Sequence, residues 1–391
     1  MKSLGSELVS NRLSGVEFPG VRKILQLAEA IPNTISFALG EPDFDTPENI
    51  KKAAIDAIRE GFTKYTSNYG ILELRQSIAK KLKRENNIDV DPRSEILVTV
   101  GVQEALYAAF QALLNPGDEV IISDPCYHSY PRMIKLAGGK PVYVKLTDNF
   151  SYDIAEIEKR ITSKTKILLL NSPQNPTGKV VSRRELESLA ALAEGHNIFI
   201  ISDEIYEKIV YDVTHVSIAS LPGMLDRTLT VNGFSKAYAM TGWRLGYCVA
   251  RKTIIDKIVR VHAYSVTSAN SVAQKAGVEA LEGPQESVNK MVSEFKRRRD
   301  YLVTRLSEIR DLNFFSPQGA FYVFPDFSNF HKRSWELAEY LLQKSGIITV
   351  PGIEYGPSRD SYLRMSFAIS MTKIEEGLNR LENALNGLRL Q

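Results

Sequence analysis

Residues 235–244 combine three side chains that could act on one ligand. Ser235 and Lys236 are adjacent, and Arg244 follows on the same short stretch. A lysine amine condenses with an aldehyde to form a Schiff base. A serine hydroxyl and an arginine fork both suit a phosphate group. The stretch therefore predicts a ligand with an aldehyde and a phosphate, which describes pyridoxal phosphate.

Such a ligand also needs a carboxylate that faces its ring nitrogen, and Asp203 is a candidate. Asp203 closely follows the apolar run 198–201, which predicts a buried strand. Tyr206 comes three residues later and could donate to a ring oxygen. The alternative is a structural role in which Asp203 caps a helix by accepting from the next amides.

Other strand ends carry suitable groups. Asn175 lies in a turn after the run 167–170 and offers an amide. Tyr127 follows the run 120–122 and could stack on a flat ring. Gly101, Val102 and Gln103 follow the run 96–100 and open a predicted helix, whose N-terminus can bind an anion. Each feature is common alone, and their placement at one sheet edge indicates a ligand site.

The elements that must position these residues alternate along the chain. Apolar runs of three to five residues, separated by helical patterns, predict strands covered on both faces; they lie at 96–100, 120–122, 141–144, 167–170, 198–201, 228–231 and 245–249. This pattern is typical of a largely parallel α/β sheet, whose ligands bind beyond the carboxyl ends of the strands. After Pro317 the order changes, and strands at 320–324, 347–350 and 362–367 with two helices predict a smaller α+β domain, joined by the N-terminal arm.

Composition places few limits on partners. With 391 residues, 43% hydrophobic and 24% charged, the chain should form a globular protein of two domains. The net charge of +3 is spread over both signs. The basic run 296–299 lies in a helical pattern with acids nearby, so we expect a solvated helix face and no nucleic-acid partner.

Cysteine and histidine usage suggests neither a disulfide framework nor a metal. Cys126 and Cys248 form no recognisable pair, and the five histidines show no ligand spacing. We therefore expect no metal ion. No signal peptide and no apolar run of about 20 residues is visible, so we expect a cytoplasmic protein without a membrane partner.

The motifs together resemble those of class I/II pyridoxal-phosphate-dependent aminotransferases of fold type I, the aspartate and aromatic aminotransferase-like enzymes. The matching pieces cover nearly the whole chain in the family's order; they are 39–44, Tyr65 to Arg75, 175–178, 203–206, 235–244, 319–322 and 363–368. The resemblance implies a large cofactor-binding domain over 45–283 with a mostly parallel seven-stranded sheet between helices. Residues 1–44 and 284–391 would form the small domain.

The resemblance also implies roles for single residues. Lys236 would hold the cofactor aldehyde and move the proton, with Asp203 on the pyridine nitrogen and Tyr206 completing the catalytic set. Further cofactor contacts would come from side chains or amides of Tyr127, Asn175, Ser235, Arg244, Val102 and Gln103. Tyr65 would reach the phosphate from the neighbouring subunit, which implies a homodimer with shared sites. Arg364 would bind the substrate α-carboxylate, helped by Gly40 and Asn175.

The chain departs from the family's pattern at three places. Ser67 stands where many relatives carry proline, and Ser358–Ser361 replaces a more glycine-rich turn before Arg364. Gln103 stands where aspartate-selective relatives can carry a lysine, so we do not expect strict aspartate specificity. A broad or aromatic range and an alanine-type range both remain open. Specificity should depend on residues near 14–20, 103 and 262–270.

The implied activity is transfer of an amino group from an L-amino acid to a 2-oxo acid such as 2-oxoglutarate, by ping-pong kinetics. A C–S β-lyase on the same fold is the alternative, because it would share the cofactor and carboxylate sites. A nicotinamide-dependent oxidoreductase lacks its G-x-G-x-x-G turn here.

Overall fold

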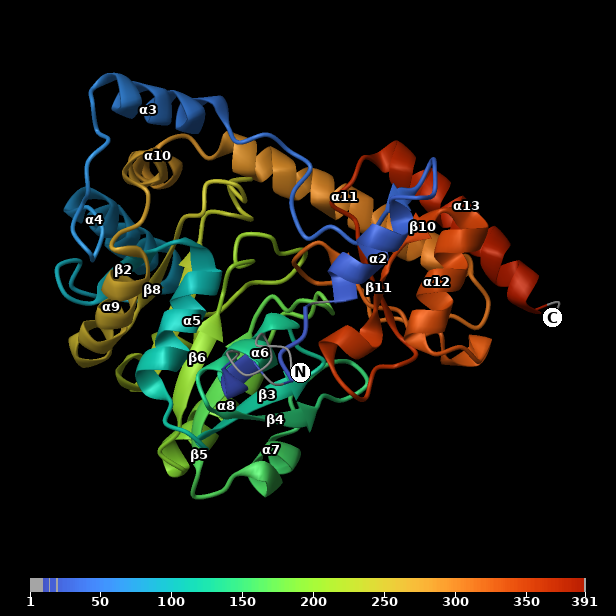
Figure 1. The fold of residues 1–391 in the computed structure, drawn as a ribbon, viewed down its shortest axis with the longest axis horizontal. Coiled ribbons are helices and arrows are strands. Elements are labelled where there is room, and N and C mark those ends of the chain that lie inside the picture. Colours follow the sequence, from blue (N-terminus) through green and yellow to red (C-terminus); the bar gives the residue numbers. More distant parts are fainter. Residues whose placement is uncertain (1–9, 14, 19, 390–391) are drawn as a thin grey trace, which may run out of the picture.

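The computed structural model describes residues 10–13, 15–18 and 20–389 and contains a central seven-stranded sheet (Figure 1). Its strands are β2 (Ile96–Thr99), β3 (Glu119–Asp124), β4 (Lys140–Lys145), β5 (Thr165–Asn171), β6 (Phe199–Asp203), β7 (Thr228–Gly233) and β8 (Gly246–Val249). They lie in the order β2-β8-β7-β6-β5-β3-β4. All neighbours run parallel except β8, which is antiparallel to both β2 and β7. The predicted α/β class is confirmed.

Helices cover both faces of this sheet. One face packs on α5 (Gly101–Leu113), α6 (Ser129–Leu136) and α9 (Lys252–Val266), and the other on α7 (Ile154–Arg160) and α8 (Arg183–Gly195). Ile121 and Ile122 enter opposite cores because successive strand residues point to opposite faces. A third core joins β2 and β8 to α3 (Glu48–Arg59), α4 (Leu72–Lys81) and α10 (Ser271–Glu282). Burial on both faces explains why the strands are continuous apolar runs.

The antiparallel strand β8 determines where the stretch 235–244 lies. The segment between β7 and β8 contains no crossover helix, so the chain turns back and β8 returns antiparallel. The stretch that makes this turn begins at the carboxyl end of β7. The carboxyl ends of the parallel neighbours β6, β5 and β3 lie at the same edge.

The remaining elements form a smaller α+β part. They are α2 (Gly20–Ala28), β1 (Ile35–Ser36), α11 (Glu286–Glu308), β9 (Tyr322–Val323), α12 (Ser334–Ser345), β10 (Ile347–Ile348), β11 (Val350–Pro351), β12 (Leu363–Ser366) and α13 (Met371–Arg389). Strands β11, β12 and β9 form an antiparallel sheet, and β1 pairs with β10 in parallel. The β1–β10 pair ties the N-terminal segment to the C-terminal part. Helix α11 runs from the side of α3 and α10 toward α12 and α13 (Figure 1).

One prediction of local structure needs correction. The run 347–350 is two strands, because the chain leaves β1 after Ile348 and pairs with β12 from Val350. Elsewhere, α4 ends at Lys81 and the chain continues as a π-helical turn over Leu82–Asn86.

The predicted solvated face of the basic run 296–299 is correct only for Lys296 and Arg297, whose side chains are 42% and 58% exposed. Arg298 and Arg299 are buried, because the helical period turns them inward. Arg298 forms an ion pair with Asp43 at 2.7 Å, and Arg299 with Asp212 at 2.6 Å. Both guanidinium groups are therefore paired with acids of the protein itself. Among the described helices, none combines the length and the apolar character needed to cross a membrane.

Candidate active site

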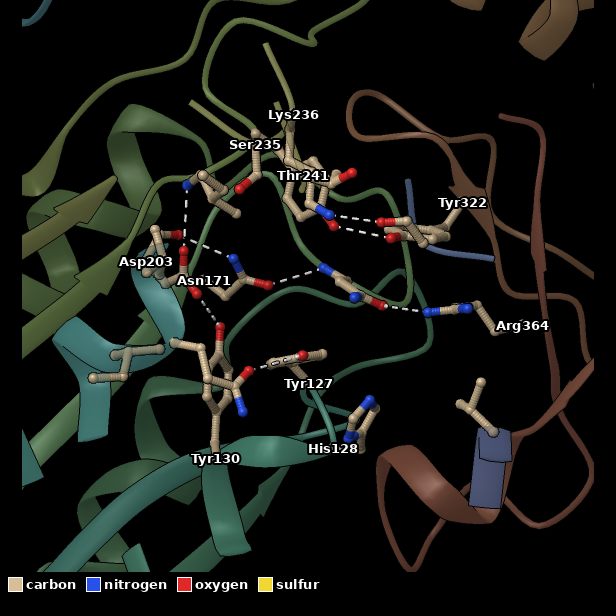
Figure 2. A pocket seen from close by; sticks show the side chains of 18 of the residues that line it. Tyr127, His128, Tyr130, Asn171, Asp203, Ser235, Lys236, Thr241, Tyr322 and Arg364 are labelled. Carbon is tan, nitrogen blue, oxygen red and sulfur yellow. Dashed lines mark hydrogen bonds between the residues drawn. The ribbon is translucent and has the colours of Figure 1, made fainter. Parts of the chain in front are cut away.

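A cavity of about 300 Å³ lies at the carboxyl edge of the large sheet, against the small part of the chain. Figure 2 shows Asp203 and Arg364 on opposite sides of it, with Lys236 and Tyr127 on the other two sides. Eleven of the twelve predicted site residues line it, namely Gly40, Val102, Gln103, Tyr127, Asn175, Asp203, Tyr206, Ser235, Lys236, Arg244 and Arg364. The exception is Tyr65, which is 88% exposed on the surface.

Lys236 presents an amine that gives up its proton readily. Its Nζ atom donates to the carbonyl of Gly40 at 2.6 Å. The same atom lies 5.9 Å from the ring centre of Tyr206 and 6.0 Å from that of Phe321. Burial lowers the pKa of Lys236 to about 8, and the charge of Arg364 acts in the same direction. At pH 7 about a tenth of the amine is then neutral, which makes it a nucleophile and a base.

Asp203 ends β6 and is 4% exposed. Its carboxylate accepts from the Tyr130 hydroxyl at 2.7 Å and from the Ile205 amide at 3.2 Å. The bond from the Ile205 amide is of the kind expected if Asp203 only capped a helix, but the segment after Asp203 forms a turn and not a helix. Burial raises the pKa of Asp203 to about 6. A carboxylate in this setting is stabilised by a cationic group that enters the cavity.

The N-terminus of α5 forms the anion-binding corner of the cavity. No side chain caps this helix, whose first residue, Gly101, has a φ of +76°. Val102, Ser235 and Arg244 line the cavity at this corner. A Cβ atom on Gly101 would lie 2.7 Å from Arg244 Nη2, so the guanidinium packs directly on the glycine. Free amides, a hydroxyl and a guanidinium together suit a phosphate.

Arg364 is a buried cation, 3% exposed, that bonds only to neutral acceptors among the described residues. It donates to the carbonyl of Ala38 and to Asn175 Oδ1 at 3.5 Å, while its Nε atom has no partner there. The guanidinium lies over the ring of Tyr322 at 4.5 Å. A buried guanidinium without an acid is well suited to bind a carboxylate from a ligand.

Several cavity residues were not predicted. Tyr130 holds Asp203, and Asn171 accepts from the backbone amide of Asn175 at 2.9 Å. The hydroxyl of Tyr322 lies 2.9 Å from that of Tyr206, which links the small part of the chain to the large one. The motif 319–322 pointed to this segment, but no sequence pattern tells which way the Tyr322 side chain turns. His128 and Thr241 also line the cavity.

A network of charged side chains beside Asp203 in sequence lies outside the cavity lining. Glu204 Oε2 contacts His215 Nε2 at 3.2 Å, and Glu204 Oε1 accepts from Ser202 and Ser217. Glu207 contacts the amine of Lys81. Glu204, Glu207 and His215 come close enough to hold a cation together. Because Lys81 and the two hydroxyl groups already bond to the carboxylates, we interpret this arrangement as a structural network of hydrogen bonds and ion pairs.

Comparison with known proteins gives consistent matches along the chain. The sequence model described as "Aminotransferase class I and II" matches residues 32–381. Aromatic-amino-acid aminotransferase 2 of Thermococcus litoralis is 41% identical, over 98% of this chain and 99% of its own length. Aspartate aminotransferase of Pyrococcus abyssi is 43% identical, over 98% of this chain and 99% of its own. The crystal structure of an aromatic aminotransferase from Pyrococcus horikoshii has a TM-score of 0.90 at 41% identity, covering 95% of this chain and 100% of that one.

The lowered pKa of Lys236 predicts a distinct reactivity of its amine. In the cofactor-free protein, the acetylation rate of Lys236 should rise with pH and level off with a midpoint of about 8, because only the neutral amine reacts. Competitive labelling with acetic anhydride and mass spectrometry measures this rate. The exposed Lys164 provides an internal comparison. A midpoint for Lys236 near the ordinary lysine value of about 10.4 would contradict the assignment.

Gly101→Ala should weaken the binding of pyridoxal phosphate about tenfold or more, because the new methyl group displaces the Arg244 guanidinium and removes a charge-assisted hydrogen bond. A fluorescence titration of the cofactor-free protein measures this affinity. Gly117→Ala is the matched control, since Gly117 has a φ of +89° but no neighbour within 4 Å of the added atom. Equal affinity losses in both variants would mean that backbone strain, and not Arg244, is responsible.

Proposed function

This chain belongs to the class I and II aminotransferase family, and from that premise we propose which residues carry the reaction and which amino acids enter it. Family membership makes the protein a pyridoxal-phosphate-dependent transaminase, which moves an amino group from an L-amino acid to a 2-oxo acid. The residue roles and the substrate preference are our inference from the cavity.

The residues present fit pyridoxal phosphate. The uncapped start of α5 with Ser235 and Arg244 matches its phosphate, and Asp203 matches its ring nitrogen. Lys236, with its lowered pKa, matches its aldehyde. When bound, the cofactor supplies a carbonyl that takes up the amino group and a ring that withdraws electrons from the substrate α-carbon.

The side chains then divide the work. Lys236 accepts the proton from the substrate α-carbon and later donates it, which its pKa near neutrality allows in both directions. Asp203 would keep the ring nitrogen protonated, and Tyr206 and Asn175 would donate to the ring oxygen. Tyr127 would pack on the ring face, and the backbone of Gly40, which lines the same cavity, would contact the substrate.

The observation that carries this proposal is the position of Arg364. Its guanidinium is buried without an acid and lies across the cavity from Asp203 (Figure 2). A substrate α-carboxylate held there places the adjacent α-carbon between Arg364 and the cofactor site. Lys236 lines the same space. Its amine is therefore placed to take the proton from the substrate α-carbon.

We infer that donors with uncharged side chains are preferred over aspartate. Gln103 offers no charge, and His128 is neutral because burial and the charges of Arg364 and Arg132 lower its pKa to about 3. Arg132 is already paired with Glu354 at 3.2 Å. A second carboxylate on the substrate therefore finds no uncommitted cation on the described part of the cavity wall. Residues 14 and 19, within the predicted specificity region 14–20, lie outside the described residues.

We also propose a cytoplasmic homodimer with shared sites, built on a large domain over 45–283 and a small domain from 1–44 and 284–391. Two surface aromatic residues support the dimer, because Tyr65 and Tyr264 are 88% and 96% exposed in the single chain. Their segments are joined where Asn68 donates to the carbonyl of Thr267 at 2.6 Å. The free, buried Cys126 and Cys248 suit a reducing compartment.

The requirement for an acceptor tests the reaction type. The cofactor-loaded protein, given L-phenylalanine alone, should form phenylpyruvate up to the number of active sites and then stop. Added 2-oxoglutarate should make product formation continuous. Continuous release of pyruvate and ammonia from L-cystathionine, which carries a sulfur leaving group on its β-carbon, without any 2-oxo acid would instead indicate the C–S β-lyase.

Gln103→Lys should raise kcat/KM for aspartate relative to phenylalanine about tenfold or more, because it adds a charge-assisted hydrogen bond to the second carboxylate. Steady-state kinetics with both donors measure the ratio. Gln111→Lys adds the same charge to α5, where Gln111 bonds to the Leu136 carbonyl outside the cavity lining. An unchanged ratio for Gln103→Lys would show that position 103 does not face the substrate side chain.

A shared site also predicts complementation between two defective chains. Tyr65→Ala should lower activity about tenfold or more by removing a bond to the phosphate, and Lys236→Ala should abolish activity. In a mixed dimer, one site combines the intact Lys236 of one chain with the intact Tyr65 of the other. Activity should therefore rise when the two variants are mixed and their subunits exchange. If mixing under verified exchange restores nothing, Tyr65 does not serve the neighbouring site.

A further inference from the structure

The departure at 358–361 lies directly on the large domain. The segment leads into β12, which carries Arg364. Asp124, at the end of β3, accepts from the Ser358 amide at 3.0 Å. A Cβ atom on Gly356 would lie 1.9 Å from Asp124 Oδ1, so the backbone here touches the carboxylate and leaves no room for a side chain.

Arg359, within this departure, is buried against the large domain at 2% exposure. Its Nη2 atom donates to the carbonyl of Leu146 at 3.1 Å. Its guanidinium lies 5.4 Å from the ring centre of Phe150 and 5.1 Å from that of Tyr362. Phe150 and Leu146 follow β4, whereas Tyr362 precedes β12. The guanidinium therefore lies beside two rings from opposite sides of the boundary between the two parts of the chain, and these rings contact each other with centres 6.3 Å apart at 69°.

A continuous set of packed rings joins Arg359 to Arg364. Tyr362 stacks on Phe324, with ring centres 5.0 Å apart and an angle of 26°. Phe324 meets Tyr355 edge-to-face at 5.8 Å. The Arg364 guanidinium lies 5.3 Å from the centre of the Tyr355 ring. A displacement at Arg359 thus reaches Arg364 through side chains that have little free space.

We propose that Arg359 is a positioning residue for the substrate carboxylate. By fixing the turn before β12 and the rings beside it against the large domain, it sets the direction of the Arg364 guanidinium. This inference rests on the proposed role of Arg364. The cavity lining does not include Arg359, so its effect passes through Arg364 and not through substrate contact.

The cofactor-loaded protein carrying Arg359→Met tests this effect. Calorimetric titration with 3-phenylpropionate and with propionate, which carry a carboxylate but no amino group, measures the affinity of the carboxylate site. We expect the dissociation constants to rise about tenfold, with cofactor content and the absorbance of the loaded protein unchanged. Arg359→Lys keeps a charge and a donor but lacks the flat face, so it should recover part of the affinity.

Arg333→Met is the matched control. Arg333 forms an exposed ion pair with Asp360 at 2.8 Å, which anchors the same turn but only within the small domain. Its loss should leave the dissociation constants unchanged. A tenfold loss in this variant as well would mean that any loosening of the turn weakens binding, and it would overturn the specific role of Arg359.

A double-mutant cycle with Arg364→Leu decides whether Arg359 acts through Arg364. If it does, Arg359→Met weakens binding about tenfold in the native background and less than about twofold when Arg364 is absent. Equal losses in both backgrounds would overturn the inference while leaving the role of Arg364 intact. Unchanged binding in Arg364→Leu itself would overturn the proposed carboxylate site together with the inference. Should Arg359→Met not fold, Arg359→Lys takes its place in the cycle.

Discussion

The cavity collects more positive than negative charge, and much of the structure follows from that imbalance. Its lining contains three permanent or potential cations, Lys236, Arg244 and Arg364, against one carboxylate, Asp203. Anionic ligands that bind in such a cavity neutralise its excess positive charge and stabilise the folded protein. A phosphate and a substrate carboxylate supply them at two separate corners, and the lowered pKa of Lys236 removes part of the excess at neutral pH. Ligand binding therefore neutralises charge that the folded chain leaves unpaired in the cavity.

Two acids that follow Asp203 in the sequence, Glu204 and Glu207, contact basic groups outside the cavity and do not neutralise its lining. Glu204, next to Asp203, faces away and meets His215. Burial alone would lower the pKa of His215, but the hydrogen bond and charge of Glu204 raise it overall. Glu207 meets Lys81. These two acids contact basic groups outside the cavity lining, so Asp203 is the one carboxylate that faces the three cations of the lining.

Sequence reasoning reached the sheet and most of the cavity for a definite physical reason. Strands buried on both faces must be apolar throughout, so their ends are visible as the points where polar residues begin. Asp203 and Asn175 were found in this way. The side-chain directions of Tyr130 and Tyr322 depend on packing between distant segments, which no local period encodes. The split of 347–350 was missed for a related reason, because its two halves pair with strands far away in sequence.

The contact between the Tyr206 and Tyr322 hydroxyls has a further consequence. Two hydroxyls 2.9 Å apart share one hydrogen bond, and only one of them can be its donor. If Tyr206 donates its hydrogen bond to an oxygen of a bound ring, the bond between the two hydroxyls requires Tyr322 to be the donor. The polarity of this bond is then dictated by the occupant of the cavity, and it is free to reverse when the occupant leaves. The direction of this one hydrogen bond, whose second hydroxyl comes from the smaller α+β part of the chain, would therefore differ between the filled and the empty cavity.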